Sequence, residues 1–218
     1  MVDSGLRVWG RKNSANVQKT LWALEELQLP YSHRLVGGAH GGLTAPAFLA
    51  MNPNGLVPVL QDGDLTLWES HATVRYLAAT YGQETLWRDD PTERAVVDQW
   101  TDWTATTFQP AWLGLFWSFV RTPAARRDAA AIANYRQRTV FALGMLNECL
   151  LATPCLAGDS LSYADIVAGV SLHRLFTMDI ELPALPGVEA WYERLGKSKA
   201  FQKVVMVSYA ELVGRLEF

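Results

Sequence analysis

The sequence predicts an α/β domain with a mixed sheet at residues 1–82, a linker at 83–92 and an all-α helical domain at 93–218. Two observations support this division. Short apolar stretches alternate with helical patterns as far as Gly82. From about Pro91 onward strand patterns disappear and long helical patterns follow. The 218 residues are enough to form two small domains and to bury a sizeable core.

The pattern of the first domain is β-α-β-α-β-β-α. Ser14 is suited to cap the first helix and Pro30 to stop it. Residues 37–42 must form a loop, because five of these six residues are Gly or Ala. Asp62-Gly63 supplies the turn of a hairpin. The expected strands are 6–9, 31–36, 57–60 and 65–68, and the expected helices are 14–30, 45–52 and 69–82.

The helical patterns of the second domain are interrupted at four places. Breaks are expected at Pro110, at Thr122-Pro123, at 152–159 and at 181–187.

Composition excludes several classes of function. The net charge is −3 and no block of Lys or Arg stands out, so neither nucleic acid nor an anionic membrane is an expected partner. No apolar run reaches the roughly 20 residues that span a bilayer, and no signal peptide is visible. Two cysteines and four scattered histidines predict no disulfide framework and no metal site, and a cytoplasmic location is the simplest.

The segment "NPNGLVPVL" at 52–60 places a proline at the start of an expected strand. A cis bond before Pro58 would leave the backbone N–H and C=O of Val57 facing outward, where an extended peptide could pair with them. The alternative is a trans proline in an ordinary turn, which base rates favour for a single X–Pro bond.

Glu69-Ser70 opens the next helix, where free N–H groups and a partial positive charge favour a carboxylate. Ser70 could donate to that carboxylate, and Glu69 could accept from an α-ammonium group. Plain helix capping is the alternative for both residues.

Taken in order, the run "NPNGLVPVLQDGDLTLWESHATVRYLA" closely resembles the glutathione-binding half of glutathione transferases. The resemblance implies a thioredoxin-like first domain, with Val57 paired to the cysteinyl part of glutathione, Pro58 in cis, and Glu69 and Ser70 holding the γ-glutamyl end. It extends along the whole chain. "LSYADIVAGV" at 161–170 resembles the capping box of the family's helical domain.

The start of the first helix is the expected sulfur site, because a thiol with a pKa near 8.5 must be stabilised as thiolate. Ser14-Ala15-Asn16 is similar to the serine context of theta- and phi-like transferases. Ser14 is the first candidate for the sulfur contact and Asn16 the second, with Asn13 a further rival. Pure helix capping by Ser14 is the alternative.

The resemblance also implies a donor for the glycyl carboxylate in the loop after the second strand. His40 is that candidate, an incidental surface histidine being the alternative, and Arg11 and Lys12 are second candidates. The electrophilic substrate is expected between the domains. Trp112, Phe116 and Arg121 are its candidate contacts, although an aromatic stripe at helical spacing is usually core or interface.

The predicted activity is a glutathione transferase that attacks an electrophilic, apolar or aromatic small molecule with glutathione thiolate. Glutathione is the co-substrate, no metal is expected, and relatives suggest a homodimer. In such a dimer Asp98 or Asp102 could reach the partner's γ-glutamyl ammonium, with structural ion pairing as the alternative. The alternative activities are a glutathione-dependent peroxidase, disulfide reductase, isomerase or dehalogenase. A non-catalytic interaction module is the third possibility.

Overall fold

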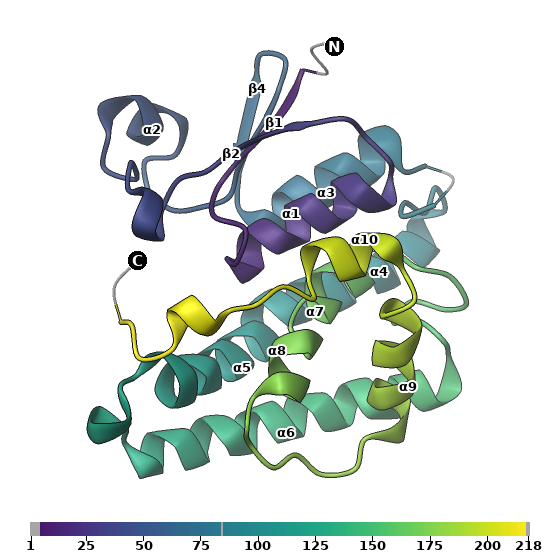
Figure 1. The fold of residues 1–218 in the computed structure, drawn as a ribbon. Helices are drawn as coiled ribbons and strands as arrows, with labels where there is room; N and C mark the ends of the chain where they lie inside the picture. Colours follow the sequence, from purple (N-terminus) through teal and green to yellow (C-terminus); the bar gives the residue numbers. More distant parts are fainter. Residues whose placement is uncertain (1–4, 84, 217–218) are drawn as a thin grey trace.

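The computed structural model describes residues 5–83 and 85–216, and it contains the predicted α/β part and helical part (Figure 1). The α/β part comprises β1 (Leu6–Trp9), α1 (Ala15–Glu26), β2 (Ser32–Arg34), η1 (Gly38–His40), α2 (Pro46–Met51), β3 (Val59–Asp62), β4 (Leu65–Trp68) and α3 (Ser70–Tyr81). The order and type of its strands and α-helices confirm the prediction. η1 is a single 3₁₀ turn within the predicted glycine-rich loop.

The sheet has the strand order β2-β1-β3-β4. β1 runs parallel to β2 and antiparallel to β3, and β3 runs antiparallel to β4. Asp62 pairs with Leu65, so the two-residue turn of the hairpin is Gly63-Asp64 and not the predicted Asp62-Gly63. Gly63 has a φ of +56°, a conformation in which a side chain is strained.

The first helix, α1, is buried on several sides. Val17, Leu21 and Leu24 are buried at the predicted helical spacing, but Lys19 and Thr20 are fully buried as well. The cause is the position of α1 between the sheet and the helical part (Figure 1). Side chains that face solvent in an ordinary surface helix therefore lie in the interior here.

α1 ends at Glu26, before the predicted stop at Pro30. Gln28 adopts a left-handed conformation with a φ of +53°, which a continuing helix cannot contain. The helix thus ends four residues before the proline that signals the stop in the sequence.

The second part is helical throughout, as predicted. It comprises α4 (Pro91–Trp103), η2 (Thr104–Phe108), α5 (Gln109–Phe116), η3 (Trp117–Arg121), η4 (Ala124–Arg126), α6 (Ala129–Ala152), α7 (Tyr163–Gly169), α8 (Leu172–Thr177), α9 (Pro186–Leu195), α10 (Lys199–Val204) and η5 (Ala210–Leu212). α4 begins inside the segment predicted as a linker, and the division into domains at 83–92 stays a prediction. Within the described ranges, every helix is too short or too polar to cross a bilayer.

The predicted break at Pro110 is wrong, because the chain stays helical from Pro91 to Arg121. Pro110 lies in the first turn of α5, directly after the π-helical turn η2. A proline lacks an N–H and its ring clashes with the carbonyl four residues earlier. The wider π turn displaces that carbonyl, so the helix continues through the proline.

The predicted capping box of α7 is confirmed. The Asp165 carboxylate accepts from the backbone N–H and the hydroxyl of Ser162, both at 2.9 Å, and its other oxygen accepts from the Leu156 N–H. Asp165 is fully buried, and burial raises the pKa of its carboxyl. The box therefore ties the loop before α7 to the helix.

The C-terminal segment returns between the two parts of the molecule, where α10 packs on α1 (Figure 1, yellow). After α10 the chain continues to η5, and the Gly214 N–H donates to the Val120 carbonyl at 3.0 Å. This segment closes one side of the site described below.

Candidate functional site

The turn at Val57-Pro58, directly before β3, has the cis proline that the resemblance implies. The Val57–Pro58 peptide bond is cis. Val57 precedes the paired register of β3, and its backbone N–H and C=O make no hydrogen bond within residues 5–83 and 85–216. The corner therefore offers one donor and one acceptor to an extended peptide.

The junction of β4 and α3 holds the acid and the hydroxyl beside this corner. Glu69 has a φ of +70°, which residues other than glycine rarely adopt. Its side chain is exposed and caps nothing among the described residues. Ser70 is buried as the first residue of α3, where backbone N–H groups have no partner inside the helix. A strained acidic residue that does not cap its helix favours binding over plain capping.

Ser14 and Asn16 open α1 and line a cavity of about 90 Å³. Ser14 is the N-cap residue by position, but its hydroxyl makes no capping hydrogen bond in the part of the chain that the structure describes. Helix capping alone therefore does not explain why a serine occupies position 14. The Asn16 carbonyl oxygen accepts from Lys19 Nζ at 3.1 Å, and Ser70 Oγ lies 3.5 Å from the same oxygen.

Asn13, the third rival for the sulfur contact, has its amide engaged elsewhere. Its oxygen accepts from Arg11 Nε at 3.1 Å, and its nitrogen donates to Glu211. The Asn13 backbone carbonyl accepts from Arg174. This arrangement leaves Ser14 and Asn16 as the candidates at the start of α1.

All three predicted electrophile contacts line the same small cavity from the helical part: Trp112, Phe116 and Arg121. The two rings meet edge to face with centroids 6.5 Å apart, and both side chains are almost fully buried. Burial lowers the pKa of Arg121 to about 10, and its Nε donates to the Arg215 carbonyl at 2.8 Å. The structure thus brings these three residues together with Ser14.

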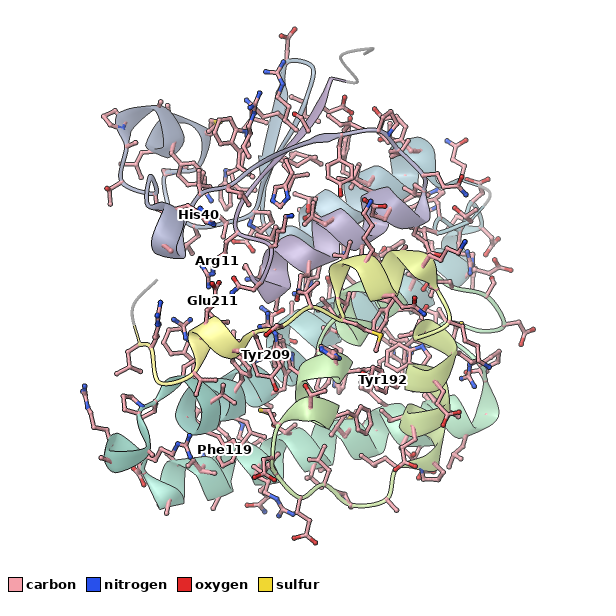
Figure 2. All side chains as sticks on the ribbon, viewed as in Figure 1. Arg11, His40, Phe119, Tyr192, Tyr209 and Glu211 are labelled. Carbon is pink, nitrogen blue, oxygen red and sulfur yellow. The ribbon has the colours of Figure 1, made fainter. Side chains whose placement is uncertain are left out.

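His40 lies in a larger neighbouring cavity of about 560 Å³. Figure 2 shows His40 and Arg11 on the side of the α/β part, with Glu211 of the C-terminal segment facing them. Arg11 lines both cavities, whereas Lys12 is exposed and lines neither. The larger cavity has basic side chains from both parts of the molecule, which suits a carboxylate.

Asp98 and Asp102, the acids considered for a partner's site, are bound within the chain. Arg75 donates to Asp98 at 2.8 Å and to Asp102 at 3.0 Å, and the Tyr163 hydroxyl also donates to Asp98. These contacts are structural ion pairs, which was the alternative to a contact with the partner's γ-glutamyl ammonium. No group of three or more His, Cys, Asp or Glu side chains suited to a metal ion occurs among the described residues.

The sequence analysis did not predict two residues of the candidate site. Glu211 reaches the site from the end of the chain, and no local pattern indicates that contact. Lys19 is buried beneath the site, with its Nζ 2.8 Å from His71 Nε2, 3.4 Å from Ser70 Oγ and in contact with Gln109 Oε1. The available signal was the position of Lys19, directly before the largely apolar stretch "TLWAL" at 20–24.

Known protein families and known proteins resemble this chain over most of its length. Residues 13–80 match the family model described as "Glutathione S-transferase, N-terminal domain", and residues 129–194 match "Glutathione S-transferase, C-terminal domain". Glutathione S-transferase GstB of Escherichia coli K12 is 42% identical over 204 residues, which cover 93% of this chain and 98% of GstB.

Two further relatives are a plant protein and a bacterial protein whose structure has been solved. Glutathione S-transferase 4 of Zea mays is 32% identical and covers 94% of this chain and 93% of its own. The theta class glutathione S-transferase from Xanthomonas axonopodis pv. citri, solved with glutathione bound, superposes with a TM-score of 0.90 at 46% identity. That alignment covers 94% of this chain and 98% of the solved one.

Proposed function

This chain belongs to the glutathione S-transferase family, and we propose that it binds glutathione as a thiolate beside Ser14 for attack on an electrophilic, apolar or aromatic small molecule. The observation that carries the proposal is the Ser14 hydroxyl, which lines a cavity with Trp112 and Phe116 and does not cap its own helix.

The chemistry begins with the thiolate. A free thiol near pKa 8.5 is only a few per cent ionised at neutral pH. Ser14 donates its hydroxyl hydrogen to the sulfur, and the open N–H groups at the start of α1 add positive potential. Asn16 is the second donor. Its side-chain oxygen accepts from Lys19, so its side-chain amide nitrogen is the atom that would donate to the sulfur. Each unit by which the thiol pKa falls corresponds to about 1.4 kcal/mol of preference for the thiolate.

The rest of the tripeptide is held from three sides. The Val57 backbone pairs with the cysteinyl residue beside the cis Pro58. Ser70 and the first N–H groups of α3 bind the γ-glutamyl carboxylate, and Glu69 binds its ammonium group. His40 binds the glycyl carboxylate in the larger cavity, with Arg11 next to it.

The electrophile binds beside the sulfur, over the small cavity that Ser14 shares with the helical part. Trp112 and Phe116 supply apolar and aromatic contacts, and Arg121 supplies a cation at the edge. Holding the electrophile beside the thiolate replaces a bimolecular encounter in water with a step inside one complex, which lowers the barrier.

The peroxidase, reductase, isomerase and dehalogenase alternatives and the non-catalytic module are not favoured, because the curated relatives are named transferases. We also propose a homodimer, as the resemblance to glutathione transferases implies. A cytoplasmic location is supported by the free thiols of Cys149 and Cys155.

The test is a conjugation assay with chloro-dinitrobenzene on the wild type and on Ser14→Ala, together with an ultraviolet titration of the bound thiol. We expect turnover by the wild type, and in the variant a thiol pKa raised by about one to two units, because a hydrogen bond to a charged group contributes about 1.5–3 kcal/mol. Unchanged turnover and pKa would show the assignment to be wrong, and Asn16→Ala is then the variant to test.

A further inference from the structure

Lys19 is a cation in the interior directly beneath the proposed glutathione site. Its side chain is fully buried, and its Nζ contacts groups from three helices. From α1 it donates to Asn16 Oδ1 at 3.1 Å, from α3 it contacts Ser70 Oγ at 3.4 Å and His71 Nε2 at 2.8 Å, and from α5 it contacts Gln109 Oε1. A buried lysine is rare unless its charge is paired or used.

We propose that Lys19 is a positioning residue of the glutathione site: its ammonium group orients the Asn16 amide and the Ser70 hydroxyl, and its charge strengthens binding of the γ-glutamyl carboxylate. This inference rests on the proposed function. Lys19 is fully buried, so it acts through Asn16 and Ser70 and does not contact the tripeptide itself. Its three N–H donors match acceptors on α1, α3 and α5.

Among the described residues, no acid contacts the Lys19 ammonium group directly. Glu69 is the acid whose charge acts on it, and the neighbouring base is His71. Asn16 and Gln109 are neutral. On the elements packed against α1, Asp165 of α7 is bound to Ser162, and Lys203 of α10 is paired with Glu25. Arg75, farther along α3, is paired with Asp98 and Asp102 of α4.

This environment makes the charge of Lys19 sensitive to a bound anion. Burial lowers the pKa of Lys19 to about 7, and the charge of Glu69 opposes that effect. A carboxylate arriving at Ser70 favours the charged form and raises the Lys19 pKa. Glutathione binding is therefore coupled to proton uptake, and affinity is highest below about pH 7 and falls as the pH rises through the pKa of the free protein.

The test uses S-methylglutathione, which has no thiol and so removes the titration of the sulfur. Calorimetry at about pH 7.5, in two buffers of different ionisation enthalpy, measures the protons taken up on binding. If the Lys19 pKa rises by one unit, the wild type takes up about half a proton. Its dissociation constant rises several-fold, up to about tenfold, between about pH 6 and pH 8.5.

Lys19→Met keeps most of the side-chain volume and removes the charge. We expect it to bind S-methylglutathione about tenfold or more weakly at about pH 6.5, with no proton uptake. Lys203→Met, on an exposed lysine of α10, is the matched control and binds as the wild type does. Equal affinity and equal proton uptake in Lys19→Met and the wild type would overturn the proposal.

Two further outcomes are decisive. If Lys19→Met does not fold, the wild-type measurement stands alone, and an absence of proton uptake there overturns the proposal. If uptake is lost in His40→Asn and kept in Lys19→Met, the proton belongs to His40 and the proposal is wrong. Failure of the wild type to bind S-methylglutathione at all contradicts the proposed function instead, so the two failures are distinguishable.

Discussion

The hydroxyl oxygens of Thr20 and Thr73 lie 2.7 Å apart in the buried contact between α1 and α3. Thr73 Oγ1 also donates to the Ser70 carbonyl at 2.9 Å. Thr20 is therefore the donor in the pair, because the single hydroxyl hydrogen of Thr73 is already used. The chain of hydrogen bonds fixes α3 relative to α1, so the residues that open the two helices keep their separation.

We expect Thr73→Val to destabilise the protein by about 1–3 kcal/mol, because it leaves the Thr20 hydroxyl buried without an acceptor. Thr20→Val costs less, about 1 kcal/mol, since Thr73 keeps its bond to Ser70. The double variant costs no more than Thr73→Val alone, because the orphaned hydroxyl is gone. Urea unfolding of the four proteins checks this. Additive effects of the two substitutions would mean that the hydroxyls do not interact.

Glu69→Gln tests the acid at the start of α3. Loss of its charge removes a charge-assisted hydrogen bond to the ammonium of glutathione, so we expect about 10- to 100-fold weaker binding. Stability changes by no more than about 1 kcal/mol, because the exposed carboxylate caps nothing among the described residues and acts on Lys19 only through its charge. Calorimetry and urea unfolding separate the two effects. The control is Glu25→Gln, whose carboxylate is bound to Lys203 and Tyr31, and it leaves binding unchanged.

Much of the α/β part could be predicted because its signals are local. A proline at the start of a strand, Gly63 in a hairpin turn and Gly82 at a helix end each constrain the backbone where they stand. The combination around Pro58 also indicated the peptide corner, and the cis bond agrees with that expectation.

The remaining features depend on contacts that no local pattern contains. The helical spacing of α1 predicts one buried face, but the helical part covers a second face, so Lys19 lies in the interior. Glu211 meets Asn13 across 198 positions of sequence. Pro110 predicts a break by the ordinary rule for α-helices, and the π turn before it removes the clash on which that rule depends.

The stability of the protein should fall on acidification because of His71. Burial, together with the charge of Lys19, lowers the pKa of His71 to about 3. The folded state keeps His71 neutral, whereas the unfolded chain binds a proton below about pH 6.5. Stability from this group is therefore complete above about pH 6.5 and is lost progressively as the pH falls toward 3.

The expected loss between about pH 7.5 and pH 5 is roughly 2 kcal/mol from His71 alone. His71→Gln offers an acceptor to Lys19 but does not titrate, so its stability should fall less over that range. Urea unfolding at a fixed protein concentration measures both proteins. An identical loss in the variant and the wild type would assign the acid sensitivity to other groups.

Two glycines test how closely α6 and α9 pack. A Cβ on Gly187, in the first turn of α9, would lie 2.7 Å from the Asn147 carbonyl oxygen and 3.0 Å from the Leu151 nitrogen, both on α6. These are backbone atoms that cannot rotate away, so Gly187→Ala must push the helices apart. We expect it to destabilise the protein by about 1–3 kcal/mol.

The matched control is Gly144→Ala on α6, where an added Cβ has no described atom within 4 Å. Alanine is a better helix former than glycine, so this variant should gain about 0.5–1 kcal/mol. Urea unfolding measures both variants at one protein concentration. The same added methyl group should lower the stability at Gly187, where it meets backbone atoms, and raise it at Gly144, where it meets open space. A Gly187→Ala variant as stable as the wild type would show that α9 can shift away from α6 at little cost.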